Sequence, residues 1–128
     1  MSEKSIAQKL FIKEGQSILL VNEPSDYRQK LGNLPVDVTI ATRPMTLYDG
    51  IHLFVTSRRE LEDQLEKFTS FLKPKGIFWL MYPKGRSKIK ADINRDIIAS
   101  YVRTIGLEGI AMVSIDETWS ALRLKIVQ

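Results

Sequence analysis

Three short apolar runs stand out along the chain, at Ile18–Val21, Ile51–Val55 and Ile77–Tyr82. Strands that are apolar on both faces are typical of the centre of a parallel sheet covered by helices, so these runs predict three central strands. The segment Val36–Ile40 instead alternates apolar and polar residues. That pattern indicates a strand with one exposed face, and we expect it at an edge of the sheet.

Apolar residues at helical spacing predict helices between these strands. The clearest begins at Ser57, because Ser57 and Glu60 have the spacing of a capping box. Pro24 suits the first position of an earlier helix and Gly32 suits its end, while Asp92 can cap the last helix. A first short helix is expected to carry Ile6, Leu10 and Phe11 and to stop near Gly15, and the others are expected over residues 24–32, 57–72 and 92–105.

The last two strands, Ile110–Ile115 and Ala121–Val127, are separated by few residues. A parallel pair needs a crossover of about a dozen residues, so these strands are expected to form an antiparallel hairpin. The whole pattern predicts a three-layer, Rossmann-like α/β fold with a mainly parallel six-stranded sheet. Right-handed crossovers favour the strand order 2-1-3-4-6-5 with the last strand antiparallel, and the order 5-6 at that edge is the alternative.

Trp119 lies in the turn of this hairpin. We expect its indole to fold into the core, because burying so large a side chain stabilises a small domain. A platform on which a ligand stacks is the alternative. Arg123 is expected to pair with Asp116 or with an acid on the first strand.

Composition narrows the function classes. The 128 residues fit one domain, 1–128, and the absence of cysteine excludes disulfides and thiolate chemistry. The chain lacks a signal-peptide pattern and any run of about 18 apolar residues, so we expect a cytoplasmic protein without membrane contact. The net charge is +4, and the segment Lys84–Arg95 alone carries five cations and one anion. This basic segment indicates anion binding. It does not indicate nucleic-acid binding, because the sequence contains no recognised nucleic-acid-binding motif.

Several motifs carry a resemblance to known families. The segment FLKPKGIFWLMYPK is similar to the Leu-Lys-Pro-Gly-Gly turn and following strand of class I methyltransferases. A closer resemblance is to a small bacterial domain family of unknown function with a trimmed, methyltransferase-like Rossmann topology. It is carried by IKEGQSILLVNEP, HLFVTSRREL, YPKGRSKIKADINRD and DETWSALRLK. This resemblance implies the fold, but a fold alone does not imply a reaction.

The first strand-to-helix turn departs from the methyltransferase pattern. In class I methyltransferases a glycine-rich turn lets backbone amides approach S-adenosylmethionine, whereas here the turn reads Asn22-Glu23-Pro24-Ser25. The second strand ends in Ala41-Thr42-Arg43, where those enzymes usually carry an acid for the ribose. A G-x-G-x-x-G dinucleotide turn is also missing. We therefore expect no bound cofactor, S-adenosylmethionine included.

Candidate ligand-binding residues follow the carboxyl ends of the predicted parallel strands, where open α/β sheets bind ligands. Helix-start amides and cations there suit an anion; a capped helix and a solvated basic loop are the alternative. His52 is the only histidine and lies in an apolar run, so we expect neither a catalytic base nor a transition-metal site, and only a carboxylate Mg²⁺ site stays open. The candidates are Asn22, Glu23, Ser57, Arg58, Lys84, Ser87, Lys88, Asp92 and Arg95.

The function expected from these features is non-catalytic. The chain is predicted to bind a small anionic ligand or a protein partner at the carboxyl rim of the sheet. The alternative is a reduced methyltransferase-like enzyme, against which Glu23 and Pro24 weigh.

Overall fold

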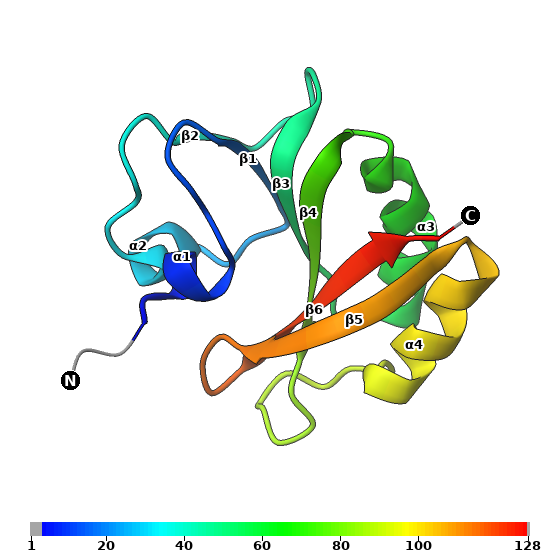
Figure 1. Ribbon diagram of the computed structural model, residues 1–128. Helices are drawn as coiled ribbons and strands as arrows, with labels where there is room; N and C mark the ends of the chain where they lie inside the picture. The colour runs from blue at the N-terminus through cyan, green and yellow to red at the C-terminus, as the bar shows by residue number, and fades with distance from the viewer. Residues whose placement is uncertain (1–3, 128) are drawn as a thin grey trace.

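The three apolar runs form neighbouring parallel strands at the centre of one six-stranded sheet in the computed structural model, which describes residues 4–127 (Figure 1). The order is β2-β1-β3-β4-β6-β5, with β6 antiparallel to both β4 and β5. The predicted fold class and strand order are confirmed. The strands are β1 (Ser17–Val21), β2 (Thr39–Ala41), β3 (Tyr48–Phe54), β4 (Leu72–Pro83), β5 (Leu107–Ser114) and β6 (Trp119–Ile126).

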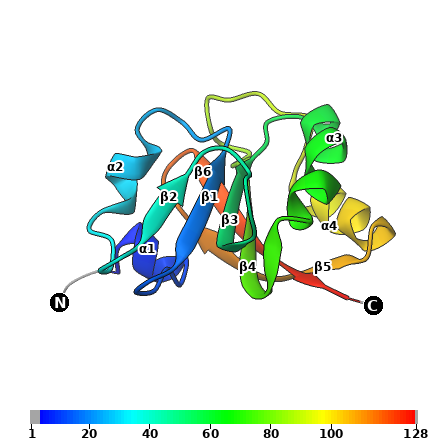
Figure 2. The same ribbon diagram turned by 90° about the horizontal axis from the view of Figure 1, so that it is seen from above.

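Helices cover both faces of this sheet, as the view from above shows (Figure 2). One side carries α1 (Ile6–Lys9) and α2 (Tyr27–Leu31). The other side carries α3 (Arg58–Thr69) and α4 (Arg95–Thr104). No helix within residues 4–127 is long and apolar enough to cross a membrane.

The sheet separates two apolar cores, because alternate residues of a strand point to opposite faces. On the α3–α4 side, residues such as Leu19, Ile51 and Leu80 pack against the apolar face of α3. On the α1–α2 side, residues such as Leu20, Phe54 and Trp79 pack against the two short helices. Each central strand therefore contributes side chains to both cores, which explains why its sequence is an unbroken apolar run.

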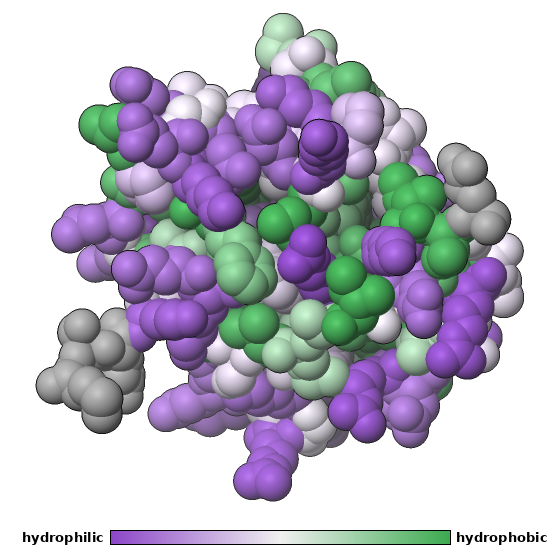
Figure 3. All heavy atoms as spheres, viewed as in Figure 1, coloured by the Kyte–Doolittle hydropathy of each residue, from purple (hydrophilic) through white to green (hydrophobic). Residues whose placement is uncertain are grey.

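Parts of the sheet remain exposed. Apolar side chains gather over β5 and β6 on the face seen in Figure 3, among hydrophilic side chains. The exposed large apolar residues of these strands are Ile110, Met112 and Ile126.

Several predicted element boundaries are wrong. The edge strand β2 covers Thr39–Ala41 rather than Val36–Ile40, because Asp37 is in the left-handed region (φ 62°) and the chain turns there. Helix α2 begins at Tyr27 and not at Pro24, whose carbonyl instead accepts a turn hydrogen bond from the Tyr27 amide. Helix α3 ends at Thr69, and Leu72 pairs with Tyr48 as the first residue of β4.

Two aromatic predictions about the core are confirmed. Trp119 is 8% exposed and meets Phe54 edge to face, with 4.9 Å between ring centroids. His52 is buried, and its Nδ1 lies 2.9 Å from the Tyr27 hydroxyl. Burial lowers the pKa of His52 to about 3, so this imidazole is neutral at physiological pH.

The buried His52 predicts a pH-dependent stability. The unfolded chain takes up a proton near pH 6.5, whereas the folded chain does so only near pH 3. The contribution of the neutral His52 side chain to the free energy of unfolding is therefore complete above pH 6.5. It is lost as the pH falls toward 3, by about 1.4 kcal/mol per pH unit. Urea unfolding at several pH values should show a shallower acid loss in His52→Gln than in the parent. Equal slopes in the two proteins would contradict the neutral, buried imidazole.

Candidate functional site

The carboxyl ends of β1, β3 and β4 lie along one edge of the sheet because the three strands are parallel. Asn22 follows β1, Ser57 follows β3 and Lys84 follows β4. Strand order reverses between β1 and β3, and in open sheets that point forms the ligand-binding crevice. The residues around this point decide what the crevice can hold.

The side chain of Asn22 spans this crevice. Its Nδ2 donates to the Phe54 carbonyl at 3.3 Å and to Gln64 Oε1 at 2.6 Å, which ties the end of β1 to β3 and α3. Its φ of 59° lies in the left-handed region that glycine favours and asparagine tolerates. The turn therefore has a backbone conformation suited to glycine, but a bridging side chain fills the approach.

The other residues of this turn do not fit S-adenosylmethionine held against bare backbone. Pro24 lacks an N–H, and the half-buried Glu23 adds a carboxylate. That carboxylate lies near Tyr27, whose pKa is raised by burial first and then by the charges of Asp116 and Glu23. At the end of β2, Thr42 and Arg43 supply no acid for a ribose. This turn and the end of β2 therefore lack the open backbone and the acid that class I methyltransferases use to hold S-adenosylmethionine.

The start of α3 is capped by the chain itself. Ser57 Oγ accepts from the Glu60 amide at 3.1 Å, and Asp92 Oδ1 accepts from the Arg58 amide at 2.6 Å. The Arg58 guanidinium pairs with Glu62 at 3.1 Å. Two amides and one cation that were candidates for an anion are therefore bound by protein groups.

Two expectations about helix caps need correction. Asp92 does not cap the last helix; Asn94 does, with its Oδ1 accepting from the Ile97 amide at 2.9 Å. Asp92 reaches back across the rim to α3 instead. The Glu60 carboxylate accepts from the Thr56 amide at 2.9 Å, one residue before the position that a capping box requires.

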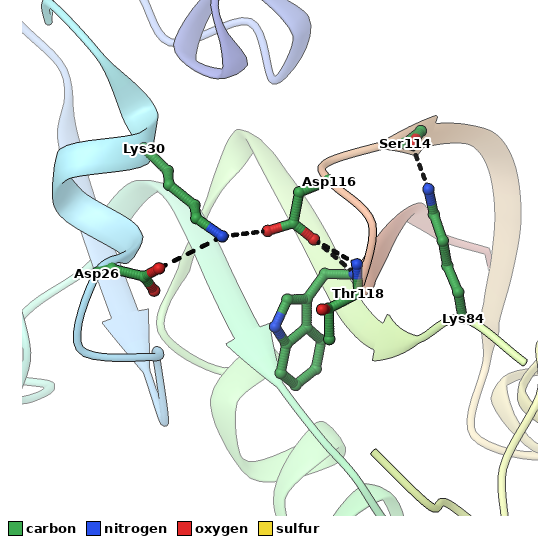
Figure 4. A network of polar contacts seen from close by, with 7 residues as sticks. Asp26, Lys30, Lys84, Ser114, Asp116 and Thr118 are labelled. Carbon is green, nitrogen blue, oxygen red and sulfur yellow. Dashed lines mark hydrogen bonds and ion pairs between the residues drawn. The ribbon is translucent and has the colours of Figure 1, made fainter. Parts of the chain in front are cut away.

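The basic loop after β4 is fastened to the β5–β6 hairpin. The Lys84 amide donates to the Thr118 carbonyl at 2.7 Å, and its ammonium donates to Ser114 Oγ (Figure 4). Ser87 closes the loop on itself, since its amide donates to the Lys84 carbonyl at 2.9 Å. Lys88 is exposed. Lys84 is thus the positioned cation of this loop.

A cleft of ≈ 690 Å³ opens between the end of β4, the start of α4 and the hairpin. It contains two of the predicted site residues, Lys84 and Arg95, and brings them beside Tyr82, Ser120 and Glu117. Sequence reasoning did not identify Tyr82 or Ser120 as site residues. They are 38 positions apart and become neighbours only through the β4–β6 register, in which they are direct partners.

The Tyr82 phenol is a neutral hydrogen-bonding group in this cleft. Burial raises its pKa, although the charge of Arg95 and a hydrogen bond with Ser120 act in the opposite direction. Its hydroxyl also contacts the Met112 sulfur at 3.4 Å. At neutral pH, Tyr82 therefore retains its proton.

The hairpin turn is fixed by the carboxylate of Asp116 (Figure 4). Its Oδ1 accepts from the Thr118 and Trp119 amides, both at 2.8 Å, and its Oδ2 pairs with the Lys30 ammonium at 2.7 Å. The expected pairing of Arg123 with Asp116 is wrong. The Arg123 guanidinium lies over the Phe11 ring instead, 5.6 Å from its centroid.

Residues 4–127 contain no group of three or more His, Asp or Glu side chains placed to hold a metal ion.

Comparison with known proteins identifies the fold. No protein-family profile and no curated protein matches the sequence. The chain is similar to the solved DhpI–SAH complex, with a TM-score of 0.66 and 9% identity over 96% of this chain and 82% of the other. It is also similar to a SAM-dependent methyltransferase from Aquifex aeolicus (TM-score 0.62, 12% identity, 95% and 88% covered). A ribosomal protein L11 methylase from Lactobacillus delbrueckii subsp. bulgaricus gives 0.57 and 9%, with 96% and 75% covered. The chain has a methyltransferase-like Rossmann fold.

These similarities overturn the functional expectation. We expected a non-catalytic protein that binds an anion or a partner, but the solved structures that share its fold include a SAM-dependent methyltransferase and a complex with SAH. They favour the alternative, a methyltransferase-like enzyme. The expectation relied on the residues of the first turn, Glu23 and Pro24, and not on the fold of the whole sheet.

The capping role of Asp92 can be tested by stability. Asp92→Ala removes the acceptor for the Arg58 amide and should lower the free energy of unfolding by about 1 kcal/mol, as the loss of other N-terminal helix caps does. Asp92→Asn keeps an acceptor oxygen and should lose less. Urea unfolding measures both. Asp63→Ala is the control, because it removes an exposed carboxylate from the same helix and should change stability by less than about 0.5 kcal/mol. Equal losses for Asp92→Ala and Asp63→Ala would contradict the cap.

Proposed function

We propose that this chain is a reduced methyltransferase-like enzyme. The observation that carries the proposal is the complete strand order, including the antiparallel β6 inserted between β4 and β5. This arrangement aligns over 96% of the chain with a protein solved with SAH and over 94% with the same protein in a complex described as DhpI–SAM–HEP. We also propose membership of the small bacterial family that the motifs YPKGRSKIKADINRD and DETWSALRLK resemble.

The cleft at the end of β4 supports a catalytic role for this rim. It is large enough for a small molecule, since ligand pockets span about 300–1,000 Å³. Its polar groups come from three different elements, with Tyr82 on β4, Arg95 on α4 and Ser120 on β6. Convergence of polar groups from separate elements on one concave site is typical of binding and active sites.

Titration calorimetry with S-adenosylmethionine and SAH tests the proposal. The sequence of the first turn predicts no binding, whereas a methyltransferase that uses this donor should bind it with a Kd between about 1 μM and 1 mM, the usual range of KM values. The same samples are incubated with methyl-labelled donor and a pool of small metabolites, and transfer of label is measured. Absence of both binding and transfer would overturn the proposed function.

Asn22→Gly should strengthen donor binding. The variant removes the side chain that spans the β1–β3 crevice, and glycine adopts the local φ of 59° without strain. Calorimetry should therefore give a lower Kd for SAH with Asn22→Gly than with the parent. Asn33→Gly is the control, because Asn33 is exposed and lies beside residues of α1. If both variants bind SAH as the parent does, Asn22 does not obstruct the donor.

A further inference from the structure

Three hydroxyl groups form a row across the ends of β4 and β5 and the start of β6. Tyr82 on β4 is the direct partner of Ser120 on β6, which is in turn the direct partner of Ser114 on β5. Directly opposite residues of paired strands point to the same face. The side chains of Tyr82, Ser120 and Ser114 therefore lie side by side on one face of the sheet, and the first two line the cleft.

Cations surround this row. The Lys84 ammonium is held by Ser114 at one end of the row, while Arg86 and Arg95 line the same cleft. Glu117 is the one carboxylate among its lining residues. Ser120 is only 7% exposed, so the floor of the cleft is a buried hydroxyl rather than open surface. The cleft combines net positive charge with hydroxyl donors.

We propose that this cleft binds a small molecule through a phosphate or carboxylate group. Arg95 presents a planar guanidinium, which binds such oxyanions through two parallel hydrogen bonds. Lys84 adds a second charge from a position fixed by Ser114, and the Ser120 hydroxyl lies at the floor beside Tyr82. That this molecule is the methyl acceptor rests on the proposed function, but binding of the oxyanion does not.

The position of this site differs from the one that the sequence suggested. The sequence suggested the start of α3 and the basic loop as candidate anion-binding features. The Arg58 and Glu60 amides are already bound by Asp92 and Ser57, so α3 contributes little. Lys84 turns toward the β5–β6 hairpin and brings the positive charge to the β4–β6 cleft.

The test is an NMR titration of the ¹⁵N-labelled protein with inorganic phosphate and, separately, with acetate, at constant ionic strength. Exposed charges are screened beyond about 8 Å at physiological salt, so constant ionic strength separates binding from screening. We expect saturable shifts of amides around Lys84, Arg95 and Ser120 with at least one of the two anions. The anion that binds more tightly identifies the group as phosphate or carboxylate.

Arg95→Gln should weaken this binding about tenfold, the effect expected when one charge-assisted contact is lost. Arg103→Gln is the matched control, since it removes the same charge from the last turn of the same helix and should bind as the parent does. Ser120→Ala should weaken binding without changing the charge. Equal loss in Arg95→Gln and Arg103→Gln, or no saturable shift with either anion, would overturn the site. No methyl donor is present, so failure here is distinct from failure of the proposed enzyme activity.

Discussion

The pairing of β6 with β4 is the contact on which the cleft at the end of β4 depends. It sets Trp119 opposite Pro83 and Ser120 opposite Tyr82, so one register determines both the core contact and the floor of the cleft. The carboxylate of Asp116 holds the turn that leads into this register, by accepting from two turn amides and pairing with Lys30 on α2. Burial alone would raise the pKa of Asp116, but the hydrogen bonds with Lys30 and the two amides lower it. The carboxylate therefore stays ionised and can hold the turn at neutral pH.

The carboxyl rim has two ends with different chemistry. At the β1–β3 end, the Asn22 amide crosses the crevice and Glu23 adds negative charge. At the β4–β6 end, the side chains leave a cleft in which Lys84 and Arg95 add positive charge. The β4–β6 end is therefore the part of the rim whose charge suits an oxyanion. The two ends differ in whether side chains fill the space beyond the strands and in the charge that those side chains carry.

The strand order was predictable from sequence because it follows from local patterns. Continuous apolar runs identify strands covered on both faces, and the short connection before Trp119 permits only a hairpin. The role of Asp92 was not predictable in this way, since its partner amide is 34 residues earlier and belongs to another helix. Tyr82 and Ser120 were missed for the same reason: a terminal apolar residue and a turn serine acquire a shared environment only when the β4–β6 register is known.

The functional expectation failed at a different step. It treated the glycine-free turn as evidence about the whole protein, although that turn governs only one end of the rim. Asn22 has the left-handed backbone conformation that glycine favours, so the substitution changes the side chain that occupies the crevice and not the path of the chain. The remaining strands belong to a fold shared with solved methyltransferases, and their carboxyl ends keep a cleft lined by polar groups from three elements. A fold of this kind fixes the edge at which ligands bind, while individual side chains decide which strand ends remain open.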